Sequence, residues 1–549
     1  MRKTLLLVFI MLVGCLTAFS QQKKQLRLIT TDFTDHNENE IPGAIVLIGN
    51  VQFEHDGANI YGKKIYFFQK EQYVKVFDAR IIQGDTVTMT STYAEYNGIQ
   101  KLAFATGNVK LQSPNSILTT DTIYYNRNIQ EAYYNSNGTI VSGENVLKSK
   151  SGRYNALDKK FIFRNNVVLT NPKAKIETNH LDYYESSGHA YVFGASNIYN
   201  KDGQHIYTEN GFYDTKNDVG RLTKNSIISY QNRTIKGDIL YTDKSRNYAS
   251  ATNNVVITDT VNKMVATGHF AELFKAKDSI VITKKALLKT MVEKDSMFLH
   301  AKKLVVTGPE GKRIAKGYND ARIFKSDMSA KCDSIFSDQY AGITKLIRKP
   351  VIWSQGSQIT GDIIYLVADT LTQKMDSIKV LNNAFIIQKD TIGTGYNQMK
   401  GVNLFGKFKN NKLSQVDLIK NTESIYYMYN DKSELIGIDK SVCSKISLFI
   451  EDNKIQEVFK YVNPDGYSYP EKDLPENARK LKNFKWRGDE EIKTLEDIFP
   501  KEELELDEKI KKESIKAVSA DQKPMKVREE TLNQNAADPK KNSKTKNKK

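Results

Sequence analysis

A repeat of nearly constant length runs through most of this chain of 549 residues. Each repeat contains an apolar residue, one residue of any type and then a small residue, and successive small residues lie 29 to 34 positions apart. A fixed period of this length is typical of stacked supersecondary units, each too small to bury its own apolar face. The sequence therefore predicts a stack of similar units. The small residues are Gly62, Ser91, Thr120, Ser149, Thr178, Thr208, Gly237, Thr267, Ala301, Ala330, Gly361 and Thr394.

Within each repeat the pattern is that of β-strands. Residues 117–125 alternate with a period of two and are rich in β-branched and aromatic residues, which favours strands. Upstream, a second short strand is expected to open with a turn residue, as at residues 49–51 and 165–167, because Asn tolerates left-handed dihedral angles. We expect an all-β fold over about residues 26–461: an elongated, twisted β-jellyroll or solenoid of stacked rungs of 29 or so residues, followed by a disordered charged tail.

The apolar residue two positions before each small residue forms a candidate inner column. A small neighbour leaves room for the facing wall or for a ligand chain; a tight corner filled by neighbouring side chains is the alternative. We expect the column to line the interior of the stack. Its twelve members are Ile60, Met89, Leu118, Leu147, Ile176, Ile206, Ile235, Val265, Leu299, Met328, Ile359 and Ile392.

Eight repeats also place a tyrosine four or five residues after the small residue. Stacked aromatic side chains on one face of a sheet stabilise neighbouring strands, and contact with a ligand is the alternative function. These tyrosines are Tyr66, Tyr96, Tyr124, Tyr154, Tyr183, Tyr213, Tyr241 and Tyr365.

The N-terminus has the pattern of a secretory signal. A cationic start at residues 1–3 precedes an apolar run at residues 5–13, which is too short to span a bilayer. We expect cleavage after Ser20 and a mature protein outside the cytoplasm. A lipoprotein box that ends at Cys15 is the alternative, and it would leave a lipid anchor there. The two later cysteines are not a disulfide framework.

The formal net charge of +17 is spread along the repeats and is not concentrated in a basic helix. No nucleic-acid-binding motif is present. A moderate positive excess fits an anionic amphiphile or a membrane surface better, and a merely soluble basic surface is the alternative. From Lys501 the composition becomes charged and repetitive, which predicts a short helix at most and then disorder that is dispensable for folding.

The sequence shows no recognisable catalytic or metal-binding motif. Its seven histidines are scattered singly, without H-E-x-x-H or a comparable pair of ligands. It also lacks G-x-S-x-G, a P-loop and a dinucleotide-binding fingerprint. We therefore expect no catalytic residue, no metal and no cofactor. Stacked rungs that bring carboxylates such as Asp121 and Asp182 together would instead indicate a polysaccharide-cleaving enzyme.

Several segments, taken in order, resemble OstA-like proteins, the large Bacteroidetes relatives of the lipopolysaccharide-transport protein LptA. They are the rungs opened by Gly-Asn-Val, the Thr-Asp-x-Ile-Tyr-Tyr strands and residues 84–87, 401–408, 423–427 and 481–489. The resemblance covers about residues 25–500. It implies a twisted β-jellyroll in the periplasm, open along one seam, whose apolar interior shields lipid acyl chains.

The same resemblance implies lipopolysaccharide or lipid A as the ligand. It also implies transport proteins of the inner and outer membranes as partners, and end-to-end self-association. This chain departs from the family in being several times longer than a minimal LptA.

We expect five segments: a signal peptide at 1–20, an N-terminal OstA/LptA-like jellyroll at 21–173, further β-rungs at 174–400, a C-terminal β module at 401–500 and the tail at 501–549. The leading hypothesis is a periplasmic protein that binds and transports lipopolysaccharide during outer-membrane assembly. Such a protein would shield acyl chains from water, since exposing one methylene group to water costs about 0.8 kcal/mol. A structural or adhesive β-solenoid without a ligand and a polysaccharide-active β-helix enzyme are the alternatives. An open apolar groove, a packed core or a carboxylate cluster would distinguish them.

Overall fold

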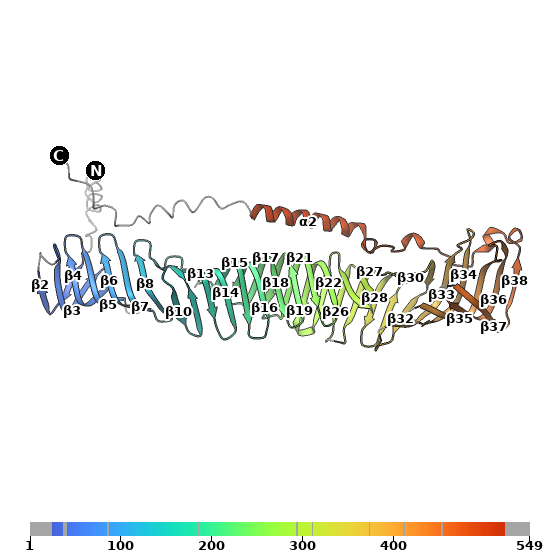
Figure 1. Cartoon of the computed structure of the whole chain (residues 1–549), viewed down its shortest axis with the longest axis horizontal. Helices are drawn as coiled ribbons and strands as arrows, with labels where there is room; N and C mark the ends of the chain where they lie inside the picture. The colour runs from blue at the N-terminus through green and yellow to red at the C-terminus, as the bar shows by residue number, and fades with distance from the viewer. Residues whose placement is uncertain are drawn as a thin grey trace, which may run out of the picture. The chain divides into compact units, whose positions relative to one another are not determined.

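The computed structural model describes residues 25–521, with gaps at 37–40, 85–86, 185, 293–294, 310, 373, 410–411 and 452–453. The expected signal peptide, with Ser20 and Cys15, and the tail from residue 522 lie outside the described residues. The chain forms two compact units: unit 1 ends at Ala249 and unit 2 begins at Ser250. Antiparallel strands dominate each unit (Figure 1), which confirms the all-β prediction.

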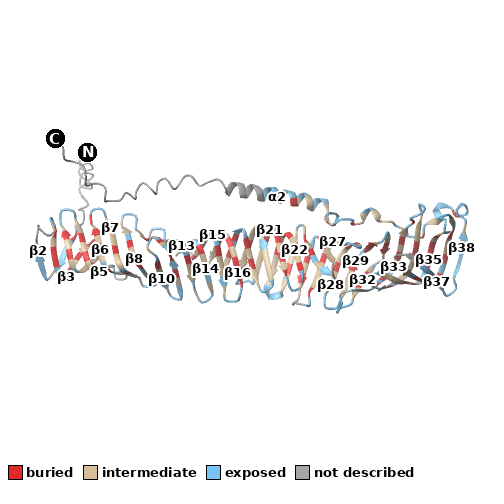
Figure 2. Ribbon diagram, viewed as in Figure 1, coloured by how far each residue is buried: buried red, intermediate tan, exposed pale blue. Residues whose placement is uncertain are grey.

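Unit 1 is a series of antiparallel strands, and most long strands pair with the next one along the chain. Because side chains alternate between the two faces of a strand, the period-two pattern places buried residues on one face of each strand (Figure 2). The strands are β1 Arg27–Thr30, β2 Phe33–Asp35, β3 Ile45–His55, β4 Ala58–Phe68, β5 Tyr73–Gln83, β6 Val87–Asn97, β7 Leu102–Gln112, β8 Ile117–Asn126, β9 Glu131–Tyr134, β10 Gly138–Ser142, β11 Asn145–Ser149, β12 Ser151–Asn155, β13 Lys160–Thr170, β14 Ala174–Tyr184, β15 His189–Asn200, β16 His205–Asp214, β17 Val219–Lys224, β18 Ser226–Tyr230, β19 Arg233–Gly237 and β20 Ile239–Asp243.

Many of these strands bend at a β-bulge near their middle. In β3 the pairing with β4 shifts between Ile48 and Val51, across a Gly-Asn pair with φ angles of 75° and 41°. The same shift recurs at residues 107–108 and 165–166. Gly and Asn fit these positions because a positive φ is costly for most other residues. The turn residues expected to open a separate short strand therefore lie inside single strands and bend them.

The bends divide unit 1 into two walls, which we name after two residues of β4. The Ile60 wall consists of the strand halves reached by following the pairing from strand to strand through Ile60. The Ile65 wall consists of the halves reached in the same way through Ile65. Ile60 and Ile65 belong to one buried cluster. Leu147 of the Ile60 wall and Phe163 of the Ile65 wall share a second cluster. The apolar core of unit 1 therefore lies between the two walls.

Unit 2 repeats the arrangement of bent antiparallel strands, and β33 to β36 are its longest strands. β21 starts in the last residues of unit 1. The strands are β21 Tyr248–Asp259, β22 Met264–Phe274, β23 Ser279–Thr283, β24 Leu287–Val292, β25 Asp295–His300, β26 Lys303–Thr307, β27 Ile314–Lys325, β28 Met328–Asp338, β29 Ile343–Ile347, β30 Val351–Ser354, β31 Ser357–Thr360, β32 Ile363–Ala368, β33 Met375–Lys389, β34 Tyr396–Lys409, β35 Lys412–Tyr429, β36 Leu435–Glu451, β37 Lys454–Tyr461 and β38 Asp465–Tyr469.

After β38 the chain runs back over unit 2 as a segment without strands, residues 470–511, which we call the strap. Two buried glutamines hold its main chain. The side-chain amide of Gln398 donates to the carbonyl of Arg479 (2.8 Å) and accepts from the N–H of Leu481 (2.9 Å). Gln358 makes the same pair of bonds six residues further along the strap. The expected β module at 401–500 is thus β-structure only as far as β38.

The strap ends in the first turns of the helix α2 Lys501–Asp521. Asp507 bonds to the side chains of Lys285 and His269, with 3.1 Å to the imidazole Nε2 of His269. Residues 501–521 form one helix. The sequence predicts at most a short helix in a charged tail at this position. No helix in the described ranges is both long and apolar enough to cross a bilayer. The 3₁₀ helices of unit 2 are η1 Lys275–Lys277, η2 Glu471–Asp473, η3 Glu476–Arg479, η4 Gly488–Glu490 and η5 Glu496–Ile498.

Candidate functional site

A continuous row of apolar side chains crosses the inner face of the Ile60 wall in unit 1. Each member lies opposite the next on the neighbouring strand, so that Ile60 faces Phe53 on one side and Ile81 on the other. Residues paired in this way on one face are about 5 Å apart and in contact. We call this the Ile60 row: Phe53, Ile60, Ile81, Met89, Leu111, Leu118, Ile140, Leu147, Leu169, Ile176, Ile198, Ile206, Ile228 and Ile235.

Unit 2 has a row of its own, built in the same way. We call it the Leu299 row: Ala266, Leu288, Leu299, Ile323, Ala330, Ile352, Ile359, Ile386 and Met399. Nine residues of the predicted column lie in the row of their own unit. They are Ile60, Met89, Leu118, Leu147, Ile176, Ile206, Ile235, Leu299 and Ile359.

Val265 is displaced from the predicted column by a single residue. Ala266, which is 1% exposed, faces Leu288 in the Leu299 row, whereas Val265 lies opposite Lys289. Both Val265 and Ala266 precede a small residue by two positions, so the sequence template fits either one. Because side chains alternate between faces, an offset of one residue moves Val265 to the other face of the strand.

Met328 and Ile392 also lie outside the Leu299 row. Met328 pairs with Lys325 beside the hairpin turn, and Ala330 takes the row position opposite Ile323. Ile392 is 52% exposed, in the connection between β33 and β34. The row continues through Met399 instead. The strands β33 and β34 are 15 and 14 residues long, so the repeat lengthens beyond the spacing on which the prediction relied.

The accessibility of the inner face differs between the two units. In unit 1 the Ile60 row is only half-buried at Ile81, Met89, Leu111, Leu118, Ile140, Leu169, Ile176, Ile198 and Ile235. In unit 2 Ile386 is the one half-buried member of the Leu299 row, and Leu299, Ile323 and Ile352 are 4%, 2% and 3% exposed. Apolar surface that water can reach costs free energy in a folded protein. The accessible stretch of unit 1 is therefore the candidate functional site.

The interior of unit 2 also becomes polar near its last strands. The row position after Met399 is Ser424, which is hydrogen-bonded to Ser441 on β36 (2.9 Å). Close by, the carboxylate of Asp439 forms an ion pair with the ammonium of Lys460 on β37 (2.6 Å). A hydrocarbon chain cannot satisfy such groups, so neither the packed row nor its polar end offers unit 2 a site for acyl chains.

The two walls of unit 1 are joined on the side of their hairpin turns near β3. The imidazole of His55, at the end of β3, is hydrogen-bonded to the hydroxyl of Tyr96 (2.8 Å). The guanidinium of Arg127 donates to the main-chain carbonyl of Asp56 (2.5 Å) and lies 3.3 Å from its carboxylate. These contacts join the end of β3 to β6, and the turn after β3 to the turn after β8. They cannot be predicted from a local sequence pattern, because His55 and Tyr96 are 41 positions apart and Asp56 and Arg127 are 71 positions apart.

The predicted tyrosines divide into two sets by their offset from the small residue. Those five residues after it lie on the inner face of the Ile65 wall: Tyr96, Tyr154, Tyr183 and Tyr213. Those four residues after it lie on the outer face of a sheet: Tyr66, Tyr124, Tyr241 and Tyr365. The outer set includes stacked and cation–π contacts that stabilise the sheet, such as Lys64 over Tyr66 at 4.9 Å.

Several of the small residues occupy tight corners beside the bulges, whereas Thr394 is exposed in the connection between β33 and β34. A Cβ atom on Gly62 would lie 2.6 Å from Val76 of the next strand, which is too close. Hydroxyl-bearing members bond locally: Thr178 to Ser196 (2.7 Å) and Thr208 to the carbonyl of Asn210 (2.8 Å). At Gly62, Thr178 and Thr208, neighbouring side chains and main-chain groups therefore fill the corner, and no room is left there for a ligand chain.

The described residues contain no group of His, Cys, Asp and Glu side chains arranged to hold a metal ion. Asp182 is paired with Lys160 and His180, each at 2.7 Å; burial opposes ionisation, but these partners hold the pKa of Asp182 below its usual value. Asp121 bonds to the hydroxyl of Thr122. The structure therefore gives the two carboxylates different partners and does not pair them.

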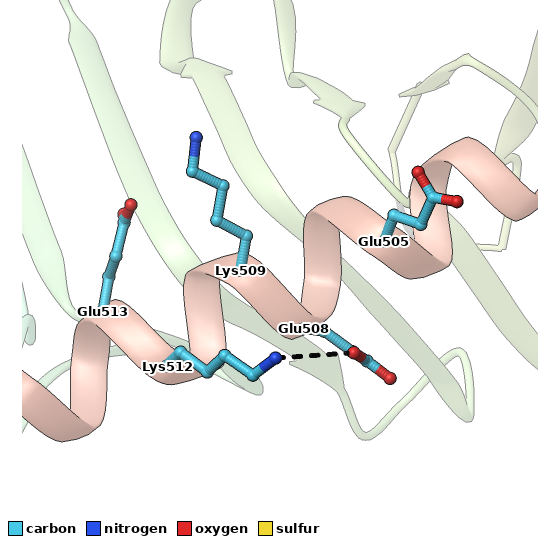
Figure 3. Close-up of a pocket in the computed structure, with 5 residues that line it drawn as sticks. All are labelled: Glu505, Glu508, Lys509, Lys512 and Glu513. Carbon is cyan, nitrogen blue, oxygen red and sulfur yellow. Dashed lines mark ion pairs between the residues drawn. The ribbon is translucent and has the colours of Figure 1, made fainter.

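A shallow hollow beside α2 is lined by charged side chains of the helix itself (Figure 3). It is lined by Glu505, Glu508, Lys509, Lys512 and Glu513, and Lys512 and Glu508 form an ion pair of 3.9 Å across one helical turn. All these residues lie on one exposed helix, so the hollow is a surface feature and not a binding site.

Comparison with known families identifies the part of the chain that contains the accessible row. Residues 23–179 match the family model of OstA-like proteins. This part of the chain is OstA-like. The OstA-like segment extends into β14 and includes the half-buried row members from Ile81 to Ile176.

No curated protein matches the chain, whereas 21 chains of solved structures match it. One of these is the crystal structure of LptH from Pseudomonas aeruginosa, described as the LptA-homologous periplasmic component of the conserved lipopolysaccharide transport device. It is 16% identical, covers 22% of this chain and 83% of its own, and has a TM-score of 0.20.

Proposed function

We propose that the protein is a non-enzymatic lipid carrier of a bacterial envelope, which shields the acyl chains of lipopolysaccharide or lipid A in the interior of unit 1. The observation that carries the proposal is the set of eight half-buried members of the Ile60 row between Ile81 and Ile198. Most of that stretch belongs to the OstA-like segment. A periplasmic location and a role in outer-membrane assembly are parts of the same proposal.

The physical argument rests on repetition. Successive row members are isoleucine, leucine or methionine on neighbouring strands about 4.8 Å apart, so they offer nearly equivalent contacts to a hydrocarbon chain. Each methylene that leaves water gains about 0.8 kcal/mol wherever it lies along the row. Equivalent positions with low barriers between them suit movement of a lipid along the row better than capture at one point.

The structural alternative, a packed solenoid without a ligand, is favoured for unit 2. Its inner row is buried at Leu299 and Ile323, and the strap covers part of its outer surface through Gln358 and Gln398. We therefore propose that unit 2 has a structural role and binds no acyl chains.

The proposed partners are transport proteins of the inner and outer membranes or a second copy of this chain. Each unit ends in short strands with exposed apolar side chains. Phe33 on β2 is 60% exposed in unit 1, and Tyr467 on β38 is 68% exposed in unit 2. Exposed edge strands are templates for pairing with another chain, which supports end-to-end association as the mode of contact.

Site-specific photocrosslinking to lipopolysaccharide tests the proposal. A crosslinker at Leu118 or Ile176 is expected to capture lipid, because both side chains belong to the accessible row. The matched controls are Thr119 and Lys175, the exposed neighbours on the other face of the same strands. Leu299 is expected to be silent. Silence from Leu118 and Ile176 in a correctly folded protein would favour the structural solenoid.

A further inference from the structure

A second row lines the edge of the accessible interior of unit 1, on the Ile65 wall next to its hairpin turns. Aromatic residues alternate with alanine along part of this row, and each member lies opposite the next. Phe161 and Ala190 pack against the buried cluster of Leu147 and Phe163, so the row faces the interior. We call it the rim row: Tyr96, Ala103, Tyr125, Ala132, Tyr154, Phe161, Tyr183, Ala190 and Tyr213.

The rings of the rim row lie at the boundary between the apolar interior and water. Tyr125, Tyr154 and Tyr183 are half-buried. At the two ends of the row, Tyr96 bonds to His55 and Tyr213 donates to the carboxylate of Asp218 (2.5 Å). Tyrosine is favoured at such boundaries because one end of the side chain is apolar and the other is polar. The rim row therefore suits the region of a lipid where acyl chains meet the polar head group.

The hairpin turns of the two walls carry opposite net charge. Between the strands of the Ile65 wall, the described residues of the turns contain seven Lys or Arg and three Asp or Glu, a net charge of +4: residues 69–72, 98–101, 127–130, 156–159, 186–188, 215–218 and 244–247. The described residues in the turns of the Ile60 wall contain two Lys and three Asp or Glu, a net charge of −1: residues 56–57, 84, 113–116, 143–144, 171–173, 201–204 and 231–232. The basic turns lie on the same wall as the rim row.

We propose that the rim row and the basic turns of the Ile65 wall form a binding site for the phosphorylated sugar head group of a lipid A-type glycolipid. The inference rests on the proposed function and assigns the head group to one wall, while the acyl chains lie against the Ile60 row. Charge complementarity selects an anionic head group and places it on the basic side. Half-buried members of the Ile60 row lie on eight strands between β5 and β15, interrupted by the buried Leu147 on β11. A surface of this length fits a lipid with several acyl chains better than one with two.

Lys159 and Lys244 are the basic residues that best test this assignment. Lys159 lies in the turn that joins Tyr154 to Phe161, and the ammonium of Lys244 lies 5.8 Å from the ring centre of Tyr213. The double variant Lys159→Gln with Lys244→Gln removes two charges beside the rim row. The matched control, Lys173→Gln with Lys201→Gln, removes two charges from the turns of the Ile60 wall.

The experiment measures equilibrium binding of diphosphoryl lipid A, phosphatidylglycerol and neutral diacylglycerol by displacement of a fluorescent fatty acid from the full chain. The Ile65-wall variant is expected to bind diphosphoryl lipid A about fivefold more weakly at low salt, with the difference shrinking as salt rises. The control variant should change less than about twofold, and diacylglycerol should bind equally to all three proteins. Tyr183→Phe, which keeps the ring and removes the hydroxyl, is expected to weaken lipid A binding in the same direction.

Equal losses in the two double variants would overturn the assignment to the Ile65 wall. Tighter binding of phosphatidylglycerol than of lipid A would overturn the glycolipid head group and favour a phospholipid. If lipid A and diacylglycerol both bind the wild-type protein with the same affinity, the head group is not recognised and the inference fails while the proposed function stands. If no lipid displaces the probe from the folded wild-type protein, the proposed function itself fails.

Discussion

The imidazole Nδ1 of His55 lies 2.8 Å from the hydroxyl of Tyr96, and this hydrogen bond joins the two walls of unit 1. The two residues are 2% and 7% exposed. Burial raises the pKa of Tyr96, which the nearby guanidinium of Arg127 partly opposes, so the hydroxyl keeps its proton at neutral pH. The accessible stretch of the Ile60 row begins at Ile81 on β5, which pairs with the strand of Tyr96.

Tyr96→Phe removes the hydroxyl and leaves a ring nitrogen of His55 buried without this partner. A buried polar group that loses its hydrogen bond costs about 1 to 3 kcal/mol, so the free energy of unfolding should fall by that amount. Chemical denaturation measures it. Tyr66→Phe is the control, because Tyr66 lies on the outer face, and it should change stability by less than about 0.5 kcal/mol. Equal effects of the two substitutions would show that the His55 contact does not hold the walls together.

Ala266→Asp and Val265→Asp are expected to have very different effects, although they alter adjacent residues. Ala266 is 1% exposed and faces Leu288, so a carboxylate there would be buried without a partner at a cost of several kcal/mol. Val265 lies on the other face, opposite Lys289, where the cost should stay near 1 kcal/mol. Thermal denaturation distinguishes them. A larger loss of stability for Val265→Asp than for Ala266→Asp would instead place Val265 in the buried row, as the sequence predicts.

Truncation of the chain before Lys501 should lower the thermal midpoint of unit 2. It removes Asp507, whose carboxylate bonds to His269 and Lys285, and Ile510, which is 7% exposed. Removing residues 522–549 alone should leave the midpoint nearly unchanged, because that composition cannot build a core. Calorimetry of the two truncated proteins is the measurement. Equal midpoints would show that the first turns of α2 contribute no stability.

The stability that the contact between the strap and Lys331 contributes depends on pH through Glu490. Hydrogen bonds from Arg487, with a further contribution from Lys331, lower the pKa of Glu490 to about 2, although burial opposes the shift. A carboxyl with a lowered pKa contributes stability that is complete above its ordinary pKa near 4.5 and is lost as the pH falls towards 2. Glu490→Gln should therefore lower the thermal midpoint at pH 7. The difference in midpoint between the variant and the wild-type protein should shrink as the pH falls from 5 to 3. A difference that stays constant over this range would contradict the assignment.

Much of the fold could be predicted from the pattern of the sequence because a stacked repeat uses the same local rules many times. The period of the small residues and the alternation within residues 117–125 predicted β-rungs, and nine of the twelve column residues lie in the row of their own unit. The Gly-Asn and Asn-Asn pairs were recognised as positions of positive φ. Their placement inside bent strands was not, because a bulge is defined by pairing with a neighbouring strand.

The three column residues outside the Leu299 row are displaced in different ways, and Met328 lies two residues before Ala330 on the same strand. Side chains on a strand alternate with a period of two, so an error of one residue reverses the face, as at Val265, and a longer strand displaces the row, as at Ile392. The same alternation separates the tyrosines: an offset of five places Tyr183 in the rim row, whereas an offset of four places Tyr124 outside.

The sequence by itself determined that the chain forms β-rungs with a repeated apolar position, because periodicity and turn chemistry are local. The tertiary structure decided which stretch of that position is accessible. Ile176 is half-buried and Ile323 is 2% exposed although both are isoleucines in equivalent rows, since accessibility depends on what lies across the interior. The strap over unit 2 and the bond between His55 and Tyr96 are likewise tertiary, because they join residues far apart in the chain whose chemistry carries no local pattern.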